Sequence, residues 1–487
     1  MHVYLLGISG AGMGPLALLL QQAGHDVSGS DVAFDPPIGP ALEAAGIRCL
    51  KGWDAAHLDA TPDLVVVGNV IRKDNPEALA VEARGIARTS MSRAIRDQFL
   101  VGRRPLVVAG THGKTTTATM CAHVFAKMGR EPGWFIGGVP RGLPAGAAIG
   151  STKKRLLAEA VERAPFVVEG DEYDDVYWSK RPKFLDYVGV GRDDVAIVTS
   201  VEQDHIDVYP DQAAYEAAFR AFVRAVPEGG LLVVDARGAR ARAIAQEEAR
   251  ARTVFYALEG DDTGDVTPTW LGAPAAFDPF GNAQFDLFAG GISCGRYTLR
   301  VPGAHNVRNA VATIAACAEG FGEDVRGMRA PLASFEGVKR RQELLGEPAG
   351  VRVYDDFAHH PTAVVETLAA LRARHPQGRL FAVFEARSAT ACRALHQDEY
   401  AQAFGPADRV IFAPLGRANI PEAERLDLGR LARDLGAKAA VAPSVDAIVA
   451  QLAEEAKAGD TIAVLSNGAF GGIHGRLLRA LSDRGAR

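Results

Sequence analysis

The chain has 487 residues, and at about 150 residues per domain this length predicts roughly three domains. With 48% hydrophobic residues, 23% charged residues and a net charge of −5, it has the composition of an ordinary soluble globular protein, and neither a nucleic acid nor an anionic membrane is indicated as a partner. The five cysteines are scattered and form no CxxC or Cys/His cluster, which predicts reduced, structural thiols.

The first part of the chain alternates short apolar runs with amphipathic stretches. Residues 3–6 and 64–67 read as strands, and residues 15–23 predict a helix. This alternation predicts a Rossmann-like domain with a parallel, doubly wound sheet over residues 1–104. The opening residues lack a basic leader and predict a strand rather than a signal peptide, and no apolar run approaches the ~18 residues that span a bilayer. We therefore expect a cytoplasmic protein.

A glycine-rich loop follows the first predicted strand, and Asp31 ends the next one. The loop contains Gly7, Gly10, Gly12 and Met13 and opens a helix, so a pyrophosphate can approach the helix N-terminus. Its glycine spacing is G-x-x-G-x-G, whereas the dinucleotide fingerprint is G-x-G-x-x-G. Two ligands remain open, the pyrophosphate of NAD, which predicts an oxidoreductase, and that of a UDP-sugar.

A charged, proline-containing break at residues 101–105 precedes a second βα series, which predicts a central domain over residues 105–336. This series begins with an apolar strand at residues 106–109, a glycine-rich turn and a helix over residues 117–127. The order strand, glycine turn and helix is typical of a phosphate-binding loop of the P-loop type.

This turn has the chemistry for ATP and Mg²⁺. Its N–H groups and the helix N-terminus converge on phosphate oxygens, Lys114 neutralises their charge, and the Thr115 hydroxyl can ligate Mg²⁺. The alternative, a glycine turn without a ligand, leaves the lysine and the threonine unexplained. The expected ATP-binding residues of the turn are Gly110, Thr111, His112, Gly113, Lys114, Thr115 and Thr116.

Two further strand ends in the central domain carry polar residues. The strand at residues 166–168 runs into a stretch from Glu169 to Asp175, in which five of seven residues are carboxylates. The strand at residues 196–198 leads to His205. Ligands of α/β sheets bind at the carboxyl ends of strands, and a cation that bridges phosphates needs oxygen ligands. The alternatives are a solvated acidic turn and a structural histidine.

The remaining pattern completes the central domain and adds a third. Residues 260–301 predict an antiparallel addition, and an Ala-rich helix over residues 306–321 follows. Asn306 and Asn309 share one face of this helix and can reach one ligand edge, although Asn306 is equally suited to cap the helix. A third βα series predicts a Rossmann-like C-terminal domain over residues 337–487. Its expected strands are residues 351–354, 381–384, 409–412 and 461–465.

The loop spelling Gly-Thr-x-Gly-Lys-Thr-Thr resembles the shortened phosphate loop of the Mur ligase family. These enzymes have three α/β domains in the order UDP-sugar binding, ATP binding and amine-substrate binding, and this order matches the three predicted domains. The resemblance implies that ATP phosphorylates a substrate carboxylate and that an amine then attacks the acyl phosphate. It also implies that Glu169 and His205 hold Mg²⁺ and that Asn306 and Asn309 contact adenine.

Three further roles are implied by the same resemblance. Arg341 reaches the γ-phosphate and Asp356 the nucleotide, both from across a domain cleft, and Asn69 lies in the segment that completes the UDP-sugar site. The expected catalytic residues are Lys114, Glu169, His205 and Arg341. The adjacent His359 and His360 suggest a metal at first sight, but sequence neighbours rarely face the same way, so zinc is not favoured there.

Four segments narrow the resemblance to family members that join UDP-N-acetylmuramate to the tripeptide L-alanyl-γ-D-glutamyl-meso-diaminopimelate in peptidoglycan recycling. They are residues 136–140, 180–184, 355–363 and 466–474. Arg387 matches the spelling Arg-Ser-x-Thr of these members and is expected to bind the peptide, the alternative being an ordinary surface arginine. Residues 9–13 resemble instead the members that add L-alanine, so L-alanine remains the alternative amine. A non-catalytic UDP-sugar sensor remains an alternative of another class.

Overall fold

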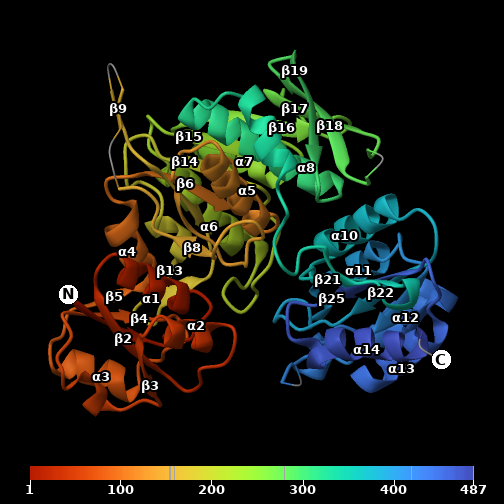
Figure 1. Cartoon of the computed structure of the whole chain (residues 1–487), viewed down its shortest axis with the longest axis horizontal. Coiled ribbons are helices and arrows are strands. Elements are labelled where there is room, and N and C mark those ends of the chain that lie inside the picture. Colours follow the sequence, from red (N-terminus) through yellow and green to blue (C-terminus); the bar gives the residue numbers. More distant parts are fainter. Residues whose placement is uncertain (153–154, 158–159, 279, 418, 486–487) are drawn as a thin grey trace.

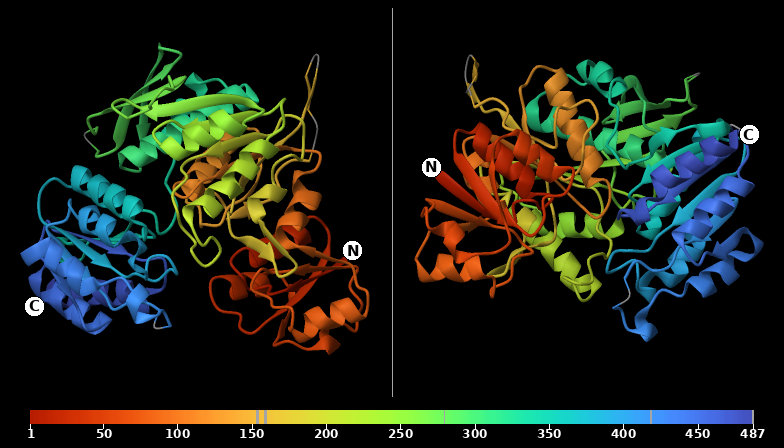
Figure 2. Two further views of the ribbon diagram at one scale, coloured as in Figure 1. Left: turned by 180° about the vertical axis from the view of Figure 1, so that it is seen from behind. Right: turned by 60° about the horizontal axis from the view of Figure 1, so that its bottom comes forward.

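Three sheets are built from successive parts of the chain in this computed structural model, which describes residues 1–152, 155–157, 160–278, 280–417 and 419–485. Figures 1 and 2 place the domain of the central sheet between the other two. The strands are mostly parallel and helices flank them, which confirms the predicted fold class. The division at residues 104/105 and 336/337 stays a prediction. No helix among the described residues is long and apolar enough to cross a membrane.

The first sheet has the order β3-β2-β1-β4-β5, and every neighbouring pair is parallel. Its strands are β1 His2–Leu6, β2 Asp26–Asp31, β3 Arg48–Lys51, β4 Leu64–Val67 and β5 Arg88–Ser90. Its helices are α1 Met13–Gln22, α2 Ile38–Ala44, α3 Pro76–Ala83 and α4 Met91–Ile95. Helix α1 begins two residues before the predicted start at Pro15, because proline is tolerated in the first turn of a helix.

The central sheet has ten strands in the order β19-β18-β17-β16-β15-β14-β6-β11-β7-β8. Its strands are β6 Arg104–Ala109, β7 Gly133–Phe135, β8 Ala147–Ala148, β11 Pro165–Glu169, β14 Val195–Val198, β15 Leu231–Asp235, β16 Arg252–Leu258, β17 Trp270–Ala275, β18 Ala283–Ala289 and β19 Ile292–Leu299. Two hairpins lie outside it, β9 Arg155–Leu157 with β10 Ala160–Glu162 and β12 Asp174–Val176 with β13 Ser179–Pro182. Strands β17, β18 and β19 pair antiparallel, as predicted for residues 260–301.

Five helices belong to the central part of the chain. They are α5 Lys114–Lys127, α6 Gln212–Ala225, α7 Ala239–Glu248, α8 Ala304–Ala315 and α9 Arg329–Ala333. Helix α5 begins three residues before the predicted start, directly after the left-handed Gly113, so Lys114 lies in its first turn. Helix α8 begins at Ala304 and passes into a wider turn at Ala316. Asn306 therefore lies inside the helix, and the alternative that it caps the helix is wrong, since Gly303 holds that position.

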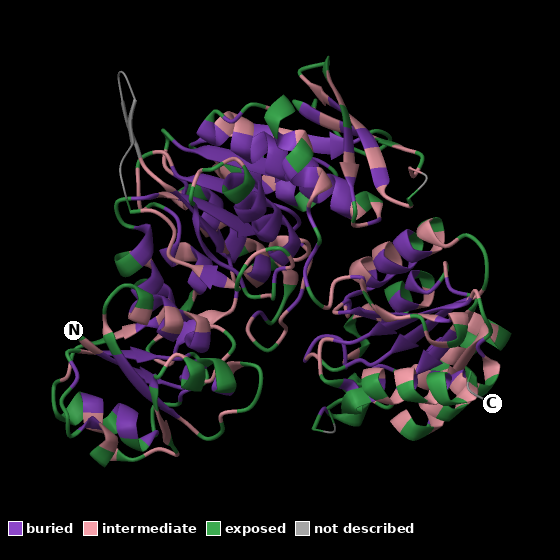
Figure 3. Cartoon of the chain, in the orientation of Figure 1, coloured by how far each residue is buried: buried purple, intermediate pink, exposed green. Residues whose placement is uncertain are grey.

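The third sheet has the order β20-β21-β25-β22-β23-β24, with only the edge strand β20 antiparallel. Its strands are β20 Glu343–Gly346, β21 Arg352–Asp356, β22 Leu380–Phe384, β23 Arg409–Phe412, β24 Ala439–Val441 and β25 Thr461–Leu465. Its helices are α10 Pro361–Arg374, α11 Gln397–Ala403, α12 Leu428–Leu435, α13 Val445–Glu455 and α14 Ile473–Gly485. Strands β22 and β25 are buried throughout and β21 is buried from Val353 on, whereas the outer helices expose one face (Figure 3).

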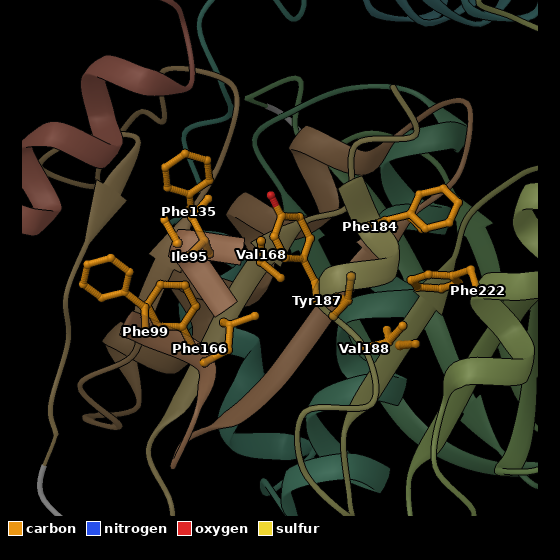
Figure 4. Close-up of a cluster of buried hydrophobic side chains, with 14 of the residues drawn as sticks. Ile95, Phe99, Phe135, Phe166, Val168, Phe184, Tyr187, Val188 and Phe222 are labelled. Atoms are coloured by element: carbon orange, nitrogen blue, oxygen red, sulfur yellow. The ribbon is translucent and has the colours of Figure 1, made fainter. Parts of the chain in front are cut away.

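One apolar cluster joins the first domain to the central sheet. Ile95 and Phe99, at the end of the first domain, belong to the same buried cluster as Phe135 and Phe166 of the central strands (Figure 4). The rings of Phe99 and Phe166 are stacked with their centroids 6.3 Å apart. Burying an aromatic side chain contributes about 1.5–3 kcal/mol. The shared core therefore stabilises the contact between these two domains.

Candidate active site

The turn between β6 and α5 needs glycine at two positions. Gly110 has φ +134°, and a Cβ there would lie 2.1 Å from Thr199 Oγ1. Gly113 has φ +80°, and its Cβ would lie 2.7 Å from Asn309 Oδ1. A side chain at either position would clash and strain the backbone. Asn309, on helix α8, therefore packs directly against the predicted phosphate loop.

The loop after β14 supports the other residues of this turn. The Thr111 hydroxyl donates to the Glu202 carbonyl at 2.9 Å, and the His112 N–H donates to Ser200 Oγ at 2.9 Å. His112 Nε2 lies 3.2 Å from Glu202 Oε2, and Thr116 is buried. These contacts hold the turn open at its N–H side and fix its position at the carboxyl edge of the sheet.

Lys114 lies at the centre of a buried polar cluster. Its ammonium donates to the Gly110 carbonyl at 2.5 Å and to Glu172 Oε1 at 2.9 Å. Glu172 is fully buried, and the same oxygen lies 3.0 Å from His205 Nε2 and accepts from the Tyr215 hydroxyl at 3.3 Å. Sequence reasoning did not single out Glu172. The acidic stretch contained the signal, but five carboxylates gave no indication of which one points inward.

The charges of this cluster support each other. Burial opposes the charge of Lys114, yet Glu172, Glu169 and Asp171 raise the pKa of its amine above the ordinary value. Burial also opposes the charge of Glu172, yet Lys114 and His205 hold the pKa of that carboxyl below its usual range. The pKa of His205 is raised despite burial, because Glu172 and Asp204 stabilise its protonated form. The ion pair between Lys114 and Glu172 therefore lies beside the phosphate loop, and neighbouring groups stabilise both of its charges.

His205 has a strained backbone. Its φ is +56°, a left-handed conformation that is uncommon for residues other than glycine, and its ring lies 4.3 Å from the ring of Tyr173 between centroids. Strain of this kind costs about 1–3 kcal/mol and clusters at functional sites. The alternative for His205 is a purely structural role. That role does not by itself account for the backbone strain.

Glu169 and Thr115 come together, as their predicted shared role requires. The Thr115 hydroxyl donates to Glu169 Oε1 at 2.6 Å, and the Gly137 N–H donates to Glu169 Oε2 at 2.7 Å. His205 reaches this group through Glu172 and Lys114. Glu172 Oε2 is buried and has no hydrogen-bond partner. Carboxylate and hydroxyl oxygens are ligands that suit Mg²⁺, so the donor set around Lys114 fits that ion.

The predicted nucleotide residues lie on two domains. Asn306 donates to the Pro302 carbonyl at 2.7 Å, and Asn309 donates to Asn306 Oδ1 at 3.4 Å, so the two amides do share one face. Asp356 is buried at the end of β21 and accepts from the N–H groups of Gln342 and Ala358, each at 2.7 Å.

Arg341 enters from the segment that connects the central and third domains. Its guanidinium lies 5.0 Å from the centre of the Phe357 ring. The neighbouring residues Arg340 and Gln342 both have positive φ, at +59° and +50°. The chain is thus held in an unusual conformation where it presents Arg341.

The first glycine loop has the geometry of a ligand site at a sheet edge. Gly7 has φ +82°, and Asp31 Oδ2 accepts from the Ser9 N–H at 3.0 Å. Strand β1 lies between β2 and β4, so the loop with Gly10 and Met13, the end of β2 and the exposed Asn69 after β4 meet at one edge. A Cβ on Gly12 would lie 4.0 Å from the Phe135 ring of the central domain. The site thus borders β7, the strand that leads to Gly137, whose N–H donates to Glu169.

The third domain contacts the loop that carries His205. The Ile206 N–H donates to Thr390 Oγ1 at 3.3 Å, and the Thr362 hydroxyl donates to Glu202 Oε2 at 2.6 Å. Arg387 precedes Thr390 by three residues, follows β22, and has a side chain that is 46% exposed. Its guanidinium lies 3.9 Å from Glu385 Oε1 and is partly open to solvent.

Three family models match successive parts of the chain. The model described as the Mur ligase family catalytic domain matches residues 2–99, the Mur ligase middle domain residues 108–317, and the Mur ligase glutamate ligase domain residues 340–468. The three α/β domains and the phosphate loop with its buried lysine, together with these matches, define an ATP-dependent ligase that forms a carbon–nitrogen bond.

Relatives and solved structures agree along the chain. An Escherichia coli protein named UDP-N-acetylmuramate–L-alanyl-γ-D-glutamyl-meso-2,6-diaminoheptandioate ligase is 36% identical over 99% of both chains. A Roseiflexus protein named UDP-N-acetylmuramate–L-alanine ligase is 37% identical over 84% of both chains. A solved murein peptide ligase from Psychrobacter arcticus is 33% identical, with a TM-score of 0.70 over 99% of both chains. The chain belongs to the Mur ligase family, and the oxidoreductase and sensor alternatives were wrong.

Proposed function

We propose that the enzyme joins the carboxylate of UDP-N-acetylmuramate to the amine of L-alanyl-γ-D-glutamyl-meso-diaminopimelate, in peptidoglycan recycling. The relative from Escherichia coli that is named for these substrates aligns along 99% of both chains. The main structural support for a peptide site in the third domain is the contact of Thr390 with the loop that carries His205. It brings the Arg387 segment of the third domain beside the phosphate loop of the central one.

The three domains supply different parts of the reaction. The loop after β1 and the end of β2 bind the UDP-sugar, whose muramyl carboxylate then extends past Phe135 toward Glu169. When bound, ATP supplies the phosphoryl group of the acyl phosphate, and Mg²⁺ neutralises charge on its phosphates. We assign Mg²⁺ binding to Thr115, Glu169 and His205, because the oxygens of the first two already meet and His205 adjoins the phosphate-loop lysine through Glu172.

The chain's own residues position the phosphates. Lys114 projects from the first turn of α5 and keeps its proton, since its buried carboxylate partners favour the charged form. Arg341 adds a second positive charge from the interdomain segment, and the N-terminus of α5 begins directly after Gly113 of the turn. Fixed donors of this kind stabilise the charge that develops during phosphoryl transfer.

The tripeptide carries several carboxylates, and these need cationic partners in the third domain. Arg387 lies at the carboxyl end of β22, where ligands of parallel sheets bind, and Arg417 donates to its carbonyl at 3.0 Å. A planar guanidinium pairs with a carboxylate through two hydrogen bonds. We therefore assign a peptide carboxylate to Arg387.

The assignment predicts a selective defect in Arg387→Ala. A hydrogen bond to a charged group contributes about 1.5–3 kcal/mol, so the KM for the tripeptide should rise about tenfold to a hundredfold. The KM values for ATP and UDP-N-acetylmuramate should stay unchanged. Arg372→Ala is the matched control, because Arg372 lies on α10 and pairs with Asp408, which precedes β23, away from the carboxyl ends of the strands. An unchanged tripeptide KM in Arg387→Ala, or an equal rise in the control, would contradict the assignment.

A further inference from the structure

A cluster of two histidines and one carboxylate lies where the central and third domains meet. His112 comes from the phosphate loop, Glu202 from the loop after β14, and His360 directly precedes α10 of the third domain. One potential ligand atom from each residue lies within 4.8 Å of the other two. His360 Nδ1 is 3.7 Å from Glu202 Oε2, and the rings of His112 and His360 are 4.6 Å apart between centroids.

His360 has one buried nitrogen without a partner, Nε2, and turns its other nitrogen, Nδ1, toward Glu202. His360 is 6% exposed, and its Nε2 has no hydrogen-bond partner, while its Nδ1 accepts from the Thr362 N–H at 3.3 Å. Buried polar atoms are nearly always paired, so an exception calls for an explanation such as a ligand. Glu202 and His360 also border solvent on one side, because they line a cavity of about 720 Å³ together with His396.

The protonation states suit a metal ion. Burial lowers the pKa of His360 well below its usual range, and the neighbouring His112 and His396 lower it further, so its imidazole is neutral. Burial opposes the charge of Glu202, but the hydrogen bond from His112 and the charges around it hold the pKa of that carboxyl well below its usual range. Metals bind neutral imidazole and ionised carboxylate, and the shifts of His360 and Glu202 are in the directions that favour these forms.

The donor types select the class of metal. Two imidazole nitrogens and one carboxylate oxygen are the three protein ligands of many zinc sites, in which a fourth position stays open. Mg²⁺ prefers oxygen ligands and is poorly matched to two imidazoles. The cluster therefore differs in kind from the oxygen-rich group of Thr115 and Glu169.

We propose that His112, Glu202 and His360 form a binding site for a zinc-class divalent transition metal, which bridges the central and third domains. Because the ligands come from both domains, a bound ion restrains their relative movement. The cavity beside Glu202 and His360 gives the ion a route from solvent and room for a water molecule in the fourth position.

His359 and His360 face different ways, as expected for neighbours in sequence. Only His360 belongs to the proposed site. His359 turns to Asp204, with Nε2 3.7 Å from Oδ2, whereas His360 turns to Glu202. The sequence did not favour zinc at these adjacent histidines. The other two residues of the cluster, His112 and Glu202, lie far away along the chain and come near His360 only in the folded protein.

Zinc titration of the full-length enzyme tests the proposal. Free Zn²⁺ is buffered by a chromophoric chelator in excess MgCl₂ and without nucleotide, so the measurement does not depend on the proposed ligase reaction. The test variants are His360→Gln and Glu202→Gln, one from each domain. The matched control is His375→Gln, at the C-terminal end of the same helix α10. Glu169→Gln serves as a control for the group that we assign to Mg²⁺.

We expect the wild type, His375→Gln and Glu169→Gln to bind one equivalent of Zn²⁺ with similar affinity. Loss of a ligand should weaken binding at least about 100-fold in His360→Gln and Glu202→Gln, since even partners outside the ligand shell contribute 10–100-fold. Co²⁺ in place of Zn²⁺ should give visible absorption bands of a four-coordinate site that both variants lose. Wild-type affinity in either variant would overturn the proposal, and so would loss of binding in Glu169→Gln alone. Circular dichroism identifies a variant that fails to fold, in which case the other variant decides.

Discussion

Removing the charge of Glu172 should destabilise the central domain. Glu172 is fully buried, and the side chains of its partners Lys114 and His205 are only 14% and 18% exposed. Glu172→Gln keeps the shape but removes the carboxylate that contacts both Lys114 and His205. Breaking a buried ion pair costs about 3–5 kcal/mol, and partial exposure of the partners places the expected loss near about 3 kcal/mol.

A double-mutant cycle separates this effect from a loss of packing. Lys114→Met removes one of the two cations, so the double variant should be at least about 1 kcal/mol more stable than the sum of the single changes predicts. Urea unfolding followed by tryptophan fluorescence measures each step, since Trp134 and Trp270 lie in strands of the central sheet. Additive effects within about 0.5 kcal/mol would refute the electrostatic account.

Three further predictions concern catalysis. Lys114→Ala should lower phosphate release about 10²–10³-fold at saturating substrates while UDP-N-acetylmuramate affinity by calorimetry is retained; activity within a few-fold of wild type would remove Lys114 from its role. Glu169→Gln should raise the Mg²⁺ concentration needed for half-maximal rate, and an unchanged MgCl₂ titration would return this residue to a structural role. The pKa of His205 is raised above its usual value by Glu172 and Asp204, so protons compete with the metal for this imidazole and the Mg²⁺ requirement of the wild type should fall as the pH rises. A requirement that is flat with pH would exclude His205 as a ligand.

The sheets could be predicted because buried parallel strands read as continuous apolar runs. Residues 106–109 fall within β6, and residues 461–465 coincide with β25. Helix starts were less accurate, since they depend on local backbone conformation. The helix after the phosphate loop begins at Lys114 because Gly113 adopts a left-handed conformation. A glycine in the sequence permits this conformation but does not require it.

Only those site residues that belong to short sequence motifs could be predicted. The phosphate loop and the acidic strand end were located, but the acidic residues have different roles in the structure. Glu169 meets Thr115, Glu172 meets Lys114, and Asp175 accepts from Ser92 in the contact with the first domain. The direction of each side chain follows from the path of the chain after β11, and no local pattern encodes it.

The central claim concerns the amine that is joined to UDP-N-acetylmuramate. The most direct measurement is ligation by the wild-type enzyme with ATP, Mg²⁺ and UDP-N-acetylmuramate, with either the tripeptide or L-alanine at equal concentration, and with the product identified by mass spectrometry. We predict efficient formation of the UDP-N-acetylmuramyl tripeptide and little product with L-alanine. Efficient turnover with L-alanine and none with the tripeptide would contradict the proposal and identify an alanine-adding member of the family.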